Sequence, residues 1–266
     1  MDASARLTTL TRLGFAARGL LYLVIAYLII RTGRTEDVSG ALRYLGEGGG
    51  RLLLIVMAAG LIGYGLWRLS DAAFNVERHD DDKQGMAQRA GAAGSGLIHL
   101  FLAWQAISLI RGAARSSSGN GTQEGAQSAL SLPGGTLMLL LAGLVLIGVG
   151  FFQLVKAAKA SFCDNLDPSV AHEPWVKWAG RLGYAARGIV FLISGFFLSR
   201  AGTEAQASEA GGMEQALSWL TSPWDMIIAI GLAAFGIFSL VEARYRIIHN
   251  PSAGALGQQA RSKLSV

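Results

Sequence analysis

The sequence predicts an all-α, polytopic membrane protein with six transmembrane helices in three pseudo-threefold helical hairpin repeats. Three observations predict this fold. First, 52% of the residues are hydrophobic and only 15% are charged, whereas soluble domains carry about 25% charged residues. Second, six apolar runs are long enough to enter a bilayer core. Third, one short motif occurs three times, each time at the start of an apolar run.

The repeated motif combines glycine, alanine and arginine. It reads RLGFAARGL at residues 12–20 and RLGYAARGI at 181–189, with a more diverged copy, RAGAAGSGL, at 89–97. We therefore expect a single membrane domain over residues 1–266. Its parts are repeat one at 12–77, repeat two at 89–160, repeat three at 181–248 and a cytoplasmic tail at 249–266.

The six apolar runs are Leu13–Ile30, Leu52–Trp67, Ala90–Ile110, Gly134–Val155, Leu182–Ser199 and Met226–Val241. A hydrocarbon core of about 30 Å needs about 20 helical residues. The second and sixth runs are shorter, so they must draw flanking residues into the interface or thin the bilayer. The first run is interpreted as a retained helix and not a signal peptide, because Arg18 lies inside it and repeat three contains its counterpart.

The basic residues predict the orientation. The N-terminus, the loops after the second and fourth helices and the C-terminal tail hold thirteen Lys and Arg residues, against seven on the opposite side. The positive-inside rule then predicts a multi-pass protein of the cell membrane with both termini in the cytoplasm. The bilayer is the expected partner. Nucleic acid is not, because the charges lie in short loops between apolar runs.

Each repeat shares further features. Residues 41–45, 129–132 and 216–220 are expected to form short amphipathic helices on the outer interface. The second helices share a glycine followed by bulky residues at Gly65, Gly150 and Gly236, although Gly148 offers an alternative register in repeat two. Because every repeat has two helices, all three enter the membrane in the same direction and form a pseudo-threefold bundle.

Polar residues at matched positions are the first candidate site. They are Arg18, Ser95 and Arg187 in the first helices, and Asp71, Lys156 and Glu242 in the second helices. The basic residue and the acid occur together in two repeats and are both missing from the middle one. This pattern predicts ion pairs within a repeat, Arg18 with Asp71 and Arg187 with Glu242, and lets Lys156 reach an acid of a neighbouring repeat. Alternatively, these side chains snorkel to the interface.

His99 is the deepest ionisable residue and the second candidate. It lies near the middle of the third helix, where the other repeats have aromatic residues, and Gln105 follows six residues later. An ionisable group inside the membrane suggests a functional role, such as a proton-responsive site or a small polar cavity. The alternative is a neutral histidine that is hydrogen-bonded to a carbonyl of an adjacent helix.

Motifs of known enzyme classes are missing from the sequence. It contains no phosphate-binding Walker loop, nucleophile elbow, dinucleotide fingerprint, CxxC pair or zinc-protease helix. The run His79-Asp80-Asp81-Asp82 and the pair His172-Glu173 are more typical of solvated loops than of metal sites. We therefore expect no enzymatic activity, no catalytic or metal-binding residues and no cofactor.

The three motif copies also carry a family resemblance. Each is followed by a hairpin that ends in aromatic residues, and the last has an Ala/Arg-rich exit at residues 242–246. In these features the chain resembles the bacterial domain-of-unknown-function family DUF1206 from about residue 12 to residue 248. The resemblance implies tandem two-helix repeats in a bacterial membrane and implies no activity.

These observations favour a non-enzymatic bundle that acts as a pore, a transporter-like protein or a small-molecule binder along its pseudo-threefold axis. The alternative is a scaffold or accessory subunit that contacts another membrane protein or a second copy of itself. A membrane enzyme that uses His99 with Asp71 or Glu242 is the weakest hypothesis. A water-filled cavity at His99 would favour the pore, transporter-like or binding function. A dry axis with an exposed glycine face would favour the scaffold.

Overall fold

The computed structural model describes residues 3–33, 41–42, 44–45, 51–77, 82–112, 121–220 and 222–247. Its six long helices are α1 (Ala3–Thr32), α3 (Arg51–Phe74), α4 (Lys83–Ile110), α6 (Gly135–Lys159), α8 (Pro174–Glu204) and α10 (Trp224–Tyr245). All six are long and apolar enough to cross a membrane. In the described ranges the only strand-like pairing is one antiparallel bridge between Leu166 and Arg246. The predicted all-α, multi-pass membrane fold is confirmed.

Short helices follow the long ones. They are α5 (Gly121–Leu130), η1 (Ser161–Asn165), α7 (Pro168–Ala171), η2 (Ala207–Glu209) and α9 (Met213–Trp219). The predicted short helix at 216–220 corresponds to α9, which packs on α8 through the buried Ala216 and Leu217. The one predicted at 129–132 overlaps only the last two residues of α5, which ends at Leu130. The predicted tail at 249–266 and residues 79–81 of the acidic run lie outside the described residues.

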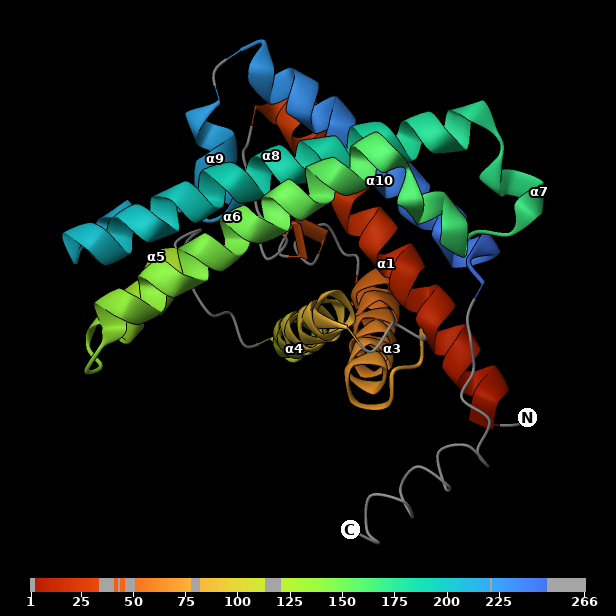
Figure 1. Cartoon of the computed structure of the whole chain (residues 1–266), viewed down its shortest axis with the longest axis horizontal. Helices are drawn as coiled ribbons and strands as arrows, with labels where there is room; N and C mark the ends of the chain where they lie inside the picture. The colour runs from red at the N-terminus through yellow and green to blue at the C-terminus, as the bar shows by residue number, and fades with distance from the viewer. Residues whose placement is uncertain are drawn as a thin grey trace, which may run out of the picture.

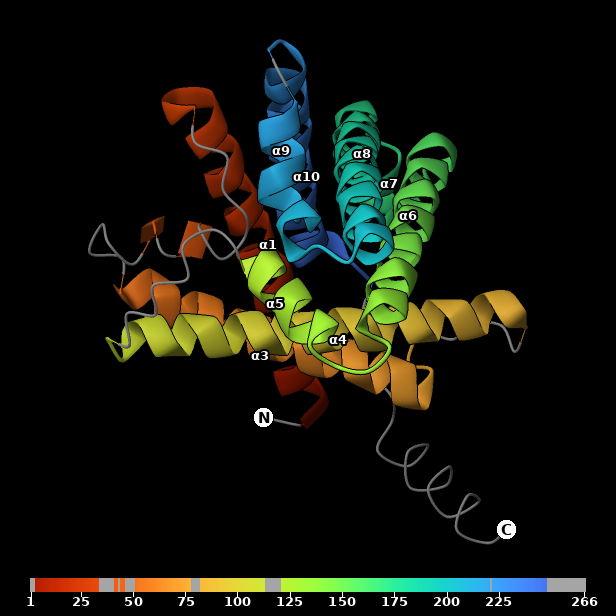
Figure 2. The ribbon, with the colours of Figure 1, turned by 90° about the vertical axis from the view of Figure 1, so that its left-hand side faces the viewer.

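The first helix of each repeat packs along the second helix of a different repeat. These pairs are α1 with α10, α4 with α3, and α8 with α6. They connect repeat one to three, two to one and three to two, so the repeats follow one another in a cycle. Figures 1 and 2 show the pairs crossing one another, with α3 and α4 running across the direction of α6 and α8.

A reciprocal glycine contact holds each of these pairs together. The contacts join Gly19 to Gly236, Gly96 to Gly65, and Gly188 to Gly150. A Cβ added at Gly150 would lie 2.9 Å from the carbonyl oxygen of Gly188 and 2.8 Å from Cγ of Leu192. Small residues are what allow membrane helices to approach this closely. The contact also settles the register of repeat two. A Cβ added at Gly148 would meet no atom of another helix within 4 Å, so Gly150 is the true counterpart of Gly65 and Gly236.

A second kind of interface joins the two helices within a repeat, and only two repeats have it. Helices α1 and α3 pack together, as do α8 and α10, whereas α4 and α6 do not pack along each other. In repeats one and three the second helix approaches through Gly60 and Gly231. Val145 occupies the matching position in repeat two, and its side chain blocks such an approach.

Aromatic residues fill the interfaces within repeats one and three. In repeat one the cluster is Phe15, Tyr64 and Trp67, whose ring centroids all lie within 6 Å of one another. In repeat three it is Tyr184, Phe235 and Phe238, where both phenylalanine rings lie within 6 Å of the ring of Tyr184. The matching residues of repeat two are Ala92, Val149 and Phe152. Val149 is 37% exposed and Phe152 is 50% exposed. The interface within repeat two is therefore open because it lacks both the glycine and two of the three rings.

Two glycines of α6 provide a matched test of this packing. We expect Gly150→Ala to destabilise the fold by about 1–3 kcal/mol, because its methyl group would meet backbone atoms of α8. Gly148→Ala adds its methyl to open space and should be neutral or slightly stabilising, since alanine favours helix. Thermal unfolding of both variants in detergent measures the difference. Equal unfolding temperatures would contradict the glycine contact.

Candidate functional site

The first arginine of every motif binds the end of a helix in a neighbouring repeat. Arg12 donates to the carbonyl oxygens of Ala243 and Arg244, Arg89 to those of Ala72 and Ala73, and Arg181 to that of Ala158. These acceptors are at the C-terminal ends of α10, α3 and α6, where carbonyl groups lack partners within the helix and the dipole favours a cation. The cyclic pairing of the repeats is thus secured by charge as well as by glycine contacts.

The second arginine of the motif, Arg18, lies in a complete set of acceptors. Its Nε donates to Oγ of Ser239 at 3.2 Å, its Nη1 donates to the hydroxyl of Tyr64 at 3.0 Å, and its Nη2 donates to Glu242. The guanidinium also lies over the ring of Phe15 at 4.7 Å. The predicted pairing of Arg18 with Asp71 within repeat one is wrong. The glycine contact next to Arg18 aligns α1 with α10 and brings it to Glu242 of repeat three.

Glu242 is the centre of this network and is 1% exposed. Its second carboxylate oxygen accepts from Nη1 of Arg246 at 2.8 Å, and Nη2 of Arg246 donates to Glu77 at 2.7 Å. Burial alone would lower the pKa of Arg246, but the carboxylates of Glu77 and Glu242 raise it above its ordinary value. The predicted pair of Arg187 with Glu242 is therefore also wrong, because Arg18 and Arg246 occupy both oxygens of Glu242.

Asp71, the acid of repeat one, is fully buried near the end of α3. It accepts from the backbone N–H of Glu77 at 2.8 Å and from Nη1 of Arg68 at 3.4 Å. Asp71 thus stabilises the chain reversal after α3. The residue of α4 that matches Arg18 and Arg187 is Ser95, so the pair of α4 with α3 has an acid but lacks the second arginine of the motif.

Arg187 is the counterpart of Arg18 in repeat three, but its surroundings differ. Its guanidinium lies over the rings of Phe235 at 4.4 Å, Phe191 at 5.1 Å and Tyr22 at 5.3 Å. Its Nε is buried and has no hydrogen-bond partner in the described part of the chain. Lys156, which was expected to reach an acid of a neighbouring repeat, instead places its ammonium 4.7 Å from the ring of Tyr184. No ion pair of Lys156 occurs among the described residues.

Matching the repeats residue by residue explains why Arg187 lacks acceptors. The positions that give Arg18 its Ser239, Glu242 and Tyr64 are occupied around Arg187 by Gln153, Lys156 and Phe235. The position of the Glu242 carboxylate thus holds the cation of Lys156, and the position of Tyr64 holds Phe235, which has no hydroxyl. Gln153 is 8% exposed, and no hydrogen bond of its side chain is found within the described ranges. The matched positions on α6 and α8 therefore carry two cations, Lys156 and Arg187, where those on α10 and α1 carry an ion pair. The rings around the Arg187 guanidinium come from α10, α1 and α8 itself.

His99 lies in the contact between α4 and α3. Its Nδ1 donates to the carbonyl oxygen of Ser95 at 2.7 Å, and its ring centroid is 4.4 Å from that of Tyr64. The alternative interpretation placed the acceptor on an adjacent helix. The acceptor is instead one turn earlier on the same helix. Gln105 follows on α4 and is partly buried. Among the described residues, no acid is found beside His99.

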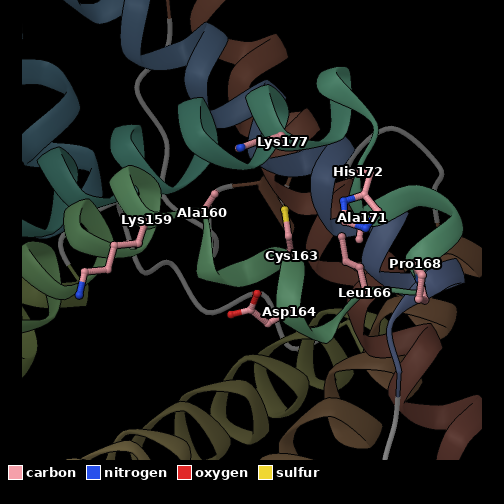
Figure 3. Close-up of a pocket in the computed structure, with 9 residues that line it drawn as sticks. All are labelled: Lys159, Ala160, Cys163, Asp164, Leu166, Pro168, Ala171, His172 and Lys177. Carbon is pink, nitrogen blue, oxygen red and sulfur yellow. The ribbon is translucent and has the colours of Figure 1, made fainter.

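A cavity of about 440 Å³ lies beside η1 and α7, where α6 ends and α8 begins. Figure 3 shows Cys163, Asp164 and His172 around it, with Lys159 from the end of α6 and Lys177 from the start of α8. None of the candidate intramembrane residues lines it. Across the described segments no three His, Cys, Asp or Glu side chains gather as metal ligands. Burial raises the pKa of the Cys163 thiol, and the ammonium of Lys177 partly offsets this.

The segment beside the cavity is fixed to the bundle. Phe162 is fully buried and stacks on Tyr184 at 5.2 Å. The backbone N–H of Asp167 donates to the carbonyl oxygen of Tyr245 at 2.8 Å, and that of Ile247 donates to Asn165 at 2.9 Å. No sequence pattern indicated this role of Phe162, because the residue lies outside the matched parts of the repeats.

Comparisons with known proteins agree with the repeat structure. The family model described as Domain of Unknown Function (DUF1206) matches residues 13–75, 90–160 and 182–246. This confirms the resemblance inferred from the motif. The chain is also 29% identical over 248 residues to the uncharacterized protein YxxB of Bacillus subtilis (strain 168), covering 88% of this chain and 90% of that protein. No solved structure matches the chain.

Removing the charge of Glu242 tests the network. We expect Glu242→Gln to cost about 3–5 kcal/mol of stability, because Arg18 and Arg246 would stay buried without their shared carboxylate. The control is Glu204→Gln, which breaks an exposed pair with Arg200 and should cost about 0–1 kcal/mol. Unfolding in a denaturant series gives both values. A similar, small effect of the two substitutions would refute the central role of Glu242.

The thiol of Cys163 offers a test of the cavity. Because its pKa is raised, less thiolate is present near pH 8, and iodoacetamide should alkylate it several-fold more slowly than in unfolded protein. The difference should shrink as the pH rises through the elevated pKa. Lys177→Ala should slow the reaction further, since the ammonium lowers the pKa. Faster alkylation in this variant would contradict the assigned surroundings of the thiol.

Proposed function

The chain belongs to the DUF1206 family, whose name assigns no activity, and we propose that it is a non-enzymatic membrane bundle that binds a small anion between α6 and α8. The observation that carries the proposal is the contrast between the two motif arginines. Arg18 has three hydrogen-bond acceptors, including a carboxylate. Arg187, at the matched position, has three aromatic rings, and its buried Nε has no acceptor among the described residues.

The free-energy cost of a charge within the bilayer favours the binding of an anion beside Arg187. A charged side chain within a bilayer is costly, by about 2.5–3.5 kcal/mol for arginine at a helix centre, and such residues are normally paired. Aromatic rings offset some of this cost, at about 0.5–2 kcal/mol for each cation–π contact, but they accept no conventional hydrogen bonds from the N–H groups of the guanidinium. A carboxylate or phosphate at the place that corresponds to Glu242 would complete the hydrogen bonds of the guanidinium.

Lys156 and Gln153 favour the same ligand. Lys156 supplies a second positive charge from α6, and the buried amide of Gln153 supplies additional hydrogen-bond donors. Two cations without an acid repel each other, so a bound anion removes a repulsion as well as adding contacts. In the orientation predicted from the basic residues, this end of α6 and α8 faces the cytoplasm.

A scaffold function is the second candidate. A Cβ added at Gly91 or Gly94 of α4 would meet no atom of the described residues within 4 Å. These glycines therefore leave a small-residue face to which another membrane protein could bind. A pore is less well supported, since the cavity beside η1 lies away from His99. Photo-crosslinking from position 94 would reveal a protein partner.

The anion site is tested with purified protein in a neutral detergent. We expect inorganic phosphate, or phosphatidylglycerol if a lipid is required, to raise the unfolding temperature, because a ligand that binds only the folded state stabilises it. Arg187→Gln and Lys156→Glu should each weaken this binding by at least tenfold. Arg200→Gln removes an exposed cation elsewhere and should not change it.

For Lys156→Glu we also expect opposite effects on stability and on anion binding. It recreates at α6 the carboxylate that α10 presents to Arg18, so it should raise the stability of the ligand-free protein while abolishing anion binding. If no anion stabilises the protein, or if both cation variants bind as the original does, the proposed function is wrong.

A further inference from the structure

The interface that repeat two leaves open is an apolar stripe on α6 that ends in a cation. Val145, Val149, Phe152 and Lys156 follow one another at helical spacing. The first three are 64%, 37% and 50% exposed. Of the matching residues of α10, Gly231, Phe235 and Phe238 are buried against α8, and Glu242 is buried in its pair with Arg18 of α1. In repeat two the same stripe is uncovered, and the acid at its end is replaced by Lys156.

Helix α4 has a corresponding free face. Ile98 is 60% exposed and Phe101 is 54% exposed, whereas the residues that match Ile98 in the other repeats, Leu21 and Val190, are 3% and 0% exposed. The α4 and α6 faces therefore have the positions of a helix–helix interface but not its packing. Among the described residues, nothing from the chain covers either one.

We infer that an anionic lipid occupies this site, with its headgroup between Lys156 and Arg187 and an acyl chain along the open stripe of α6. This inference rests on the proposed anion site. It names an amphiphilic anion as the ligand, because the apolar stripe of α6 ends in Lys156 and the second cation, Arg187, lies on α8, which packs along α6. The shared chemistry of the headgroup is a phosphodiester or a carboxylate, both of which accept hydrogen bonds from a guanidinium.

The length of the stripe fits one leaflet. From Val145 to Lys156 the helix rises by about 16 Å at 1.5 Å per residue, which is about half of a hydrocarbon core of about 30 Å. A chain that starts at Lys156 would therefore end near the middle of the bilayer. Basic pockets between transmembrane helices are known to hold anionic headgroups in this manner.

General contact with lipid does not account for the arrangement. Every outward face of a membrane protein touches acyl chains, but Arg187 has no ion pair within the described ranges, whereas the matched Arg18 has the carboxylate of Glu242. A partner protein could cover the stripe without using either cation. The joint presence of a free apolar stripe and two cations therefore favours a lipid over a protein.

The test measures lipid binding by native mass spectrometry and in nanodiscs. Phosphatidylglycerol should bind at least tenfold more tightly than phosphatidylcholine and than glycerol phosphate, which has the headgroup charge without chains. Lys156→Glu should reduce binding of phosphatidylglycerol at least tenfold, and Lys156→Gln serves if that variant does not fold.

A second variant tests the stripe apart from the charge. Val149→Phe introduces the ring that repeats one and three have at this position, so it should fill the place of the acyl chain and weaken phosphatidylglycerol binding at least tenfold. The control is Val155→Phe, the same substitution at an exposed residue about 100° around the helix from Lys156. It should leave binding unchanged.

The outcomes separate the two proposals. If inorganic phosphate or glycerol phosphate binds as tightly as phosphatidylglycerol, and binding still requires Arg187 and Lys156, the lipid inference is wrong and the anion site stands. If no anion depends on these cations, both are wrong. If phosphatidylglycerol and phosphatidylcholine bind with equal affinity, or if a protein or a second copy of the chain occupies the stripe, the lipid inference is also wrong.

Discussion

Reciprocal glycine contacts between repeats determine where every other group lies. Each motif glycine at 19, 96 and 188 meets a glycine in the second helix of another repeat, so close that neither tolerates a methyl group. Because three matched contacts join three repeats in a cycle, the helix pairs share one register. The motif arginines at 12, 89 and 181 then reach the ends of the same partner helices. Packing and charge therefore depend on the same small set of positions.

This shared register gives the three helix pairs different charges. It places Arg18 opposite Glu242, Ser95 opposite Asp71, and Arg187 opposite Lys156. The first pair is neutral and closed by hydrogen bonds. In the second, the acid is satisfied by Arg68 and a backbone N–H within its own repeat. Only the third presents two cations, which is why the anion site is proposed there and not at His99.

The sequence predicted the repeats, the six helices and the candidate residues, because each rests on local patterns that recur along the chain. It did not predict their partners. Neighbouring helices in a hairpin suggested that Arg18 pairs with Asp71, but the pairing with Glu242 depends on which repeats pack together, and no local pattern records this. The role of Gln153 could have been found from its alignment with Ser239. That of Phe162 could not, since nothing in the other repeats corresponds to it.

A double-mutant cycle between Arg18 and Glu242 tests the cyclic pairing of repeats most directly. The cycle uses Arg18→Gln and Glu242→Gln, and a parallel cycle combines Arg18→Gln with Asp71→Asn. Groups in direct contact show coupling energies of about 0.5–3 kcal/mol, whereas independent sites add within about 0.3–0.5 kcal/mol. We predict coupling above 1 kcal/mol for Arg18 with Glu242 and none beyond the additive range for Arg18 with Asp71. The reverse result would place the ion pairs within the repeats and contradict the cyclic arrangement.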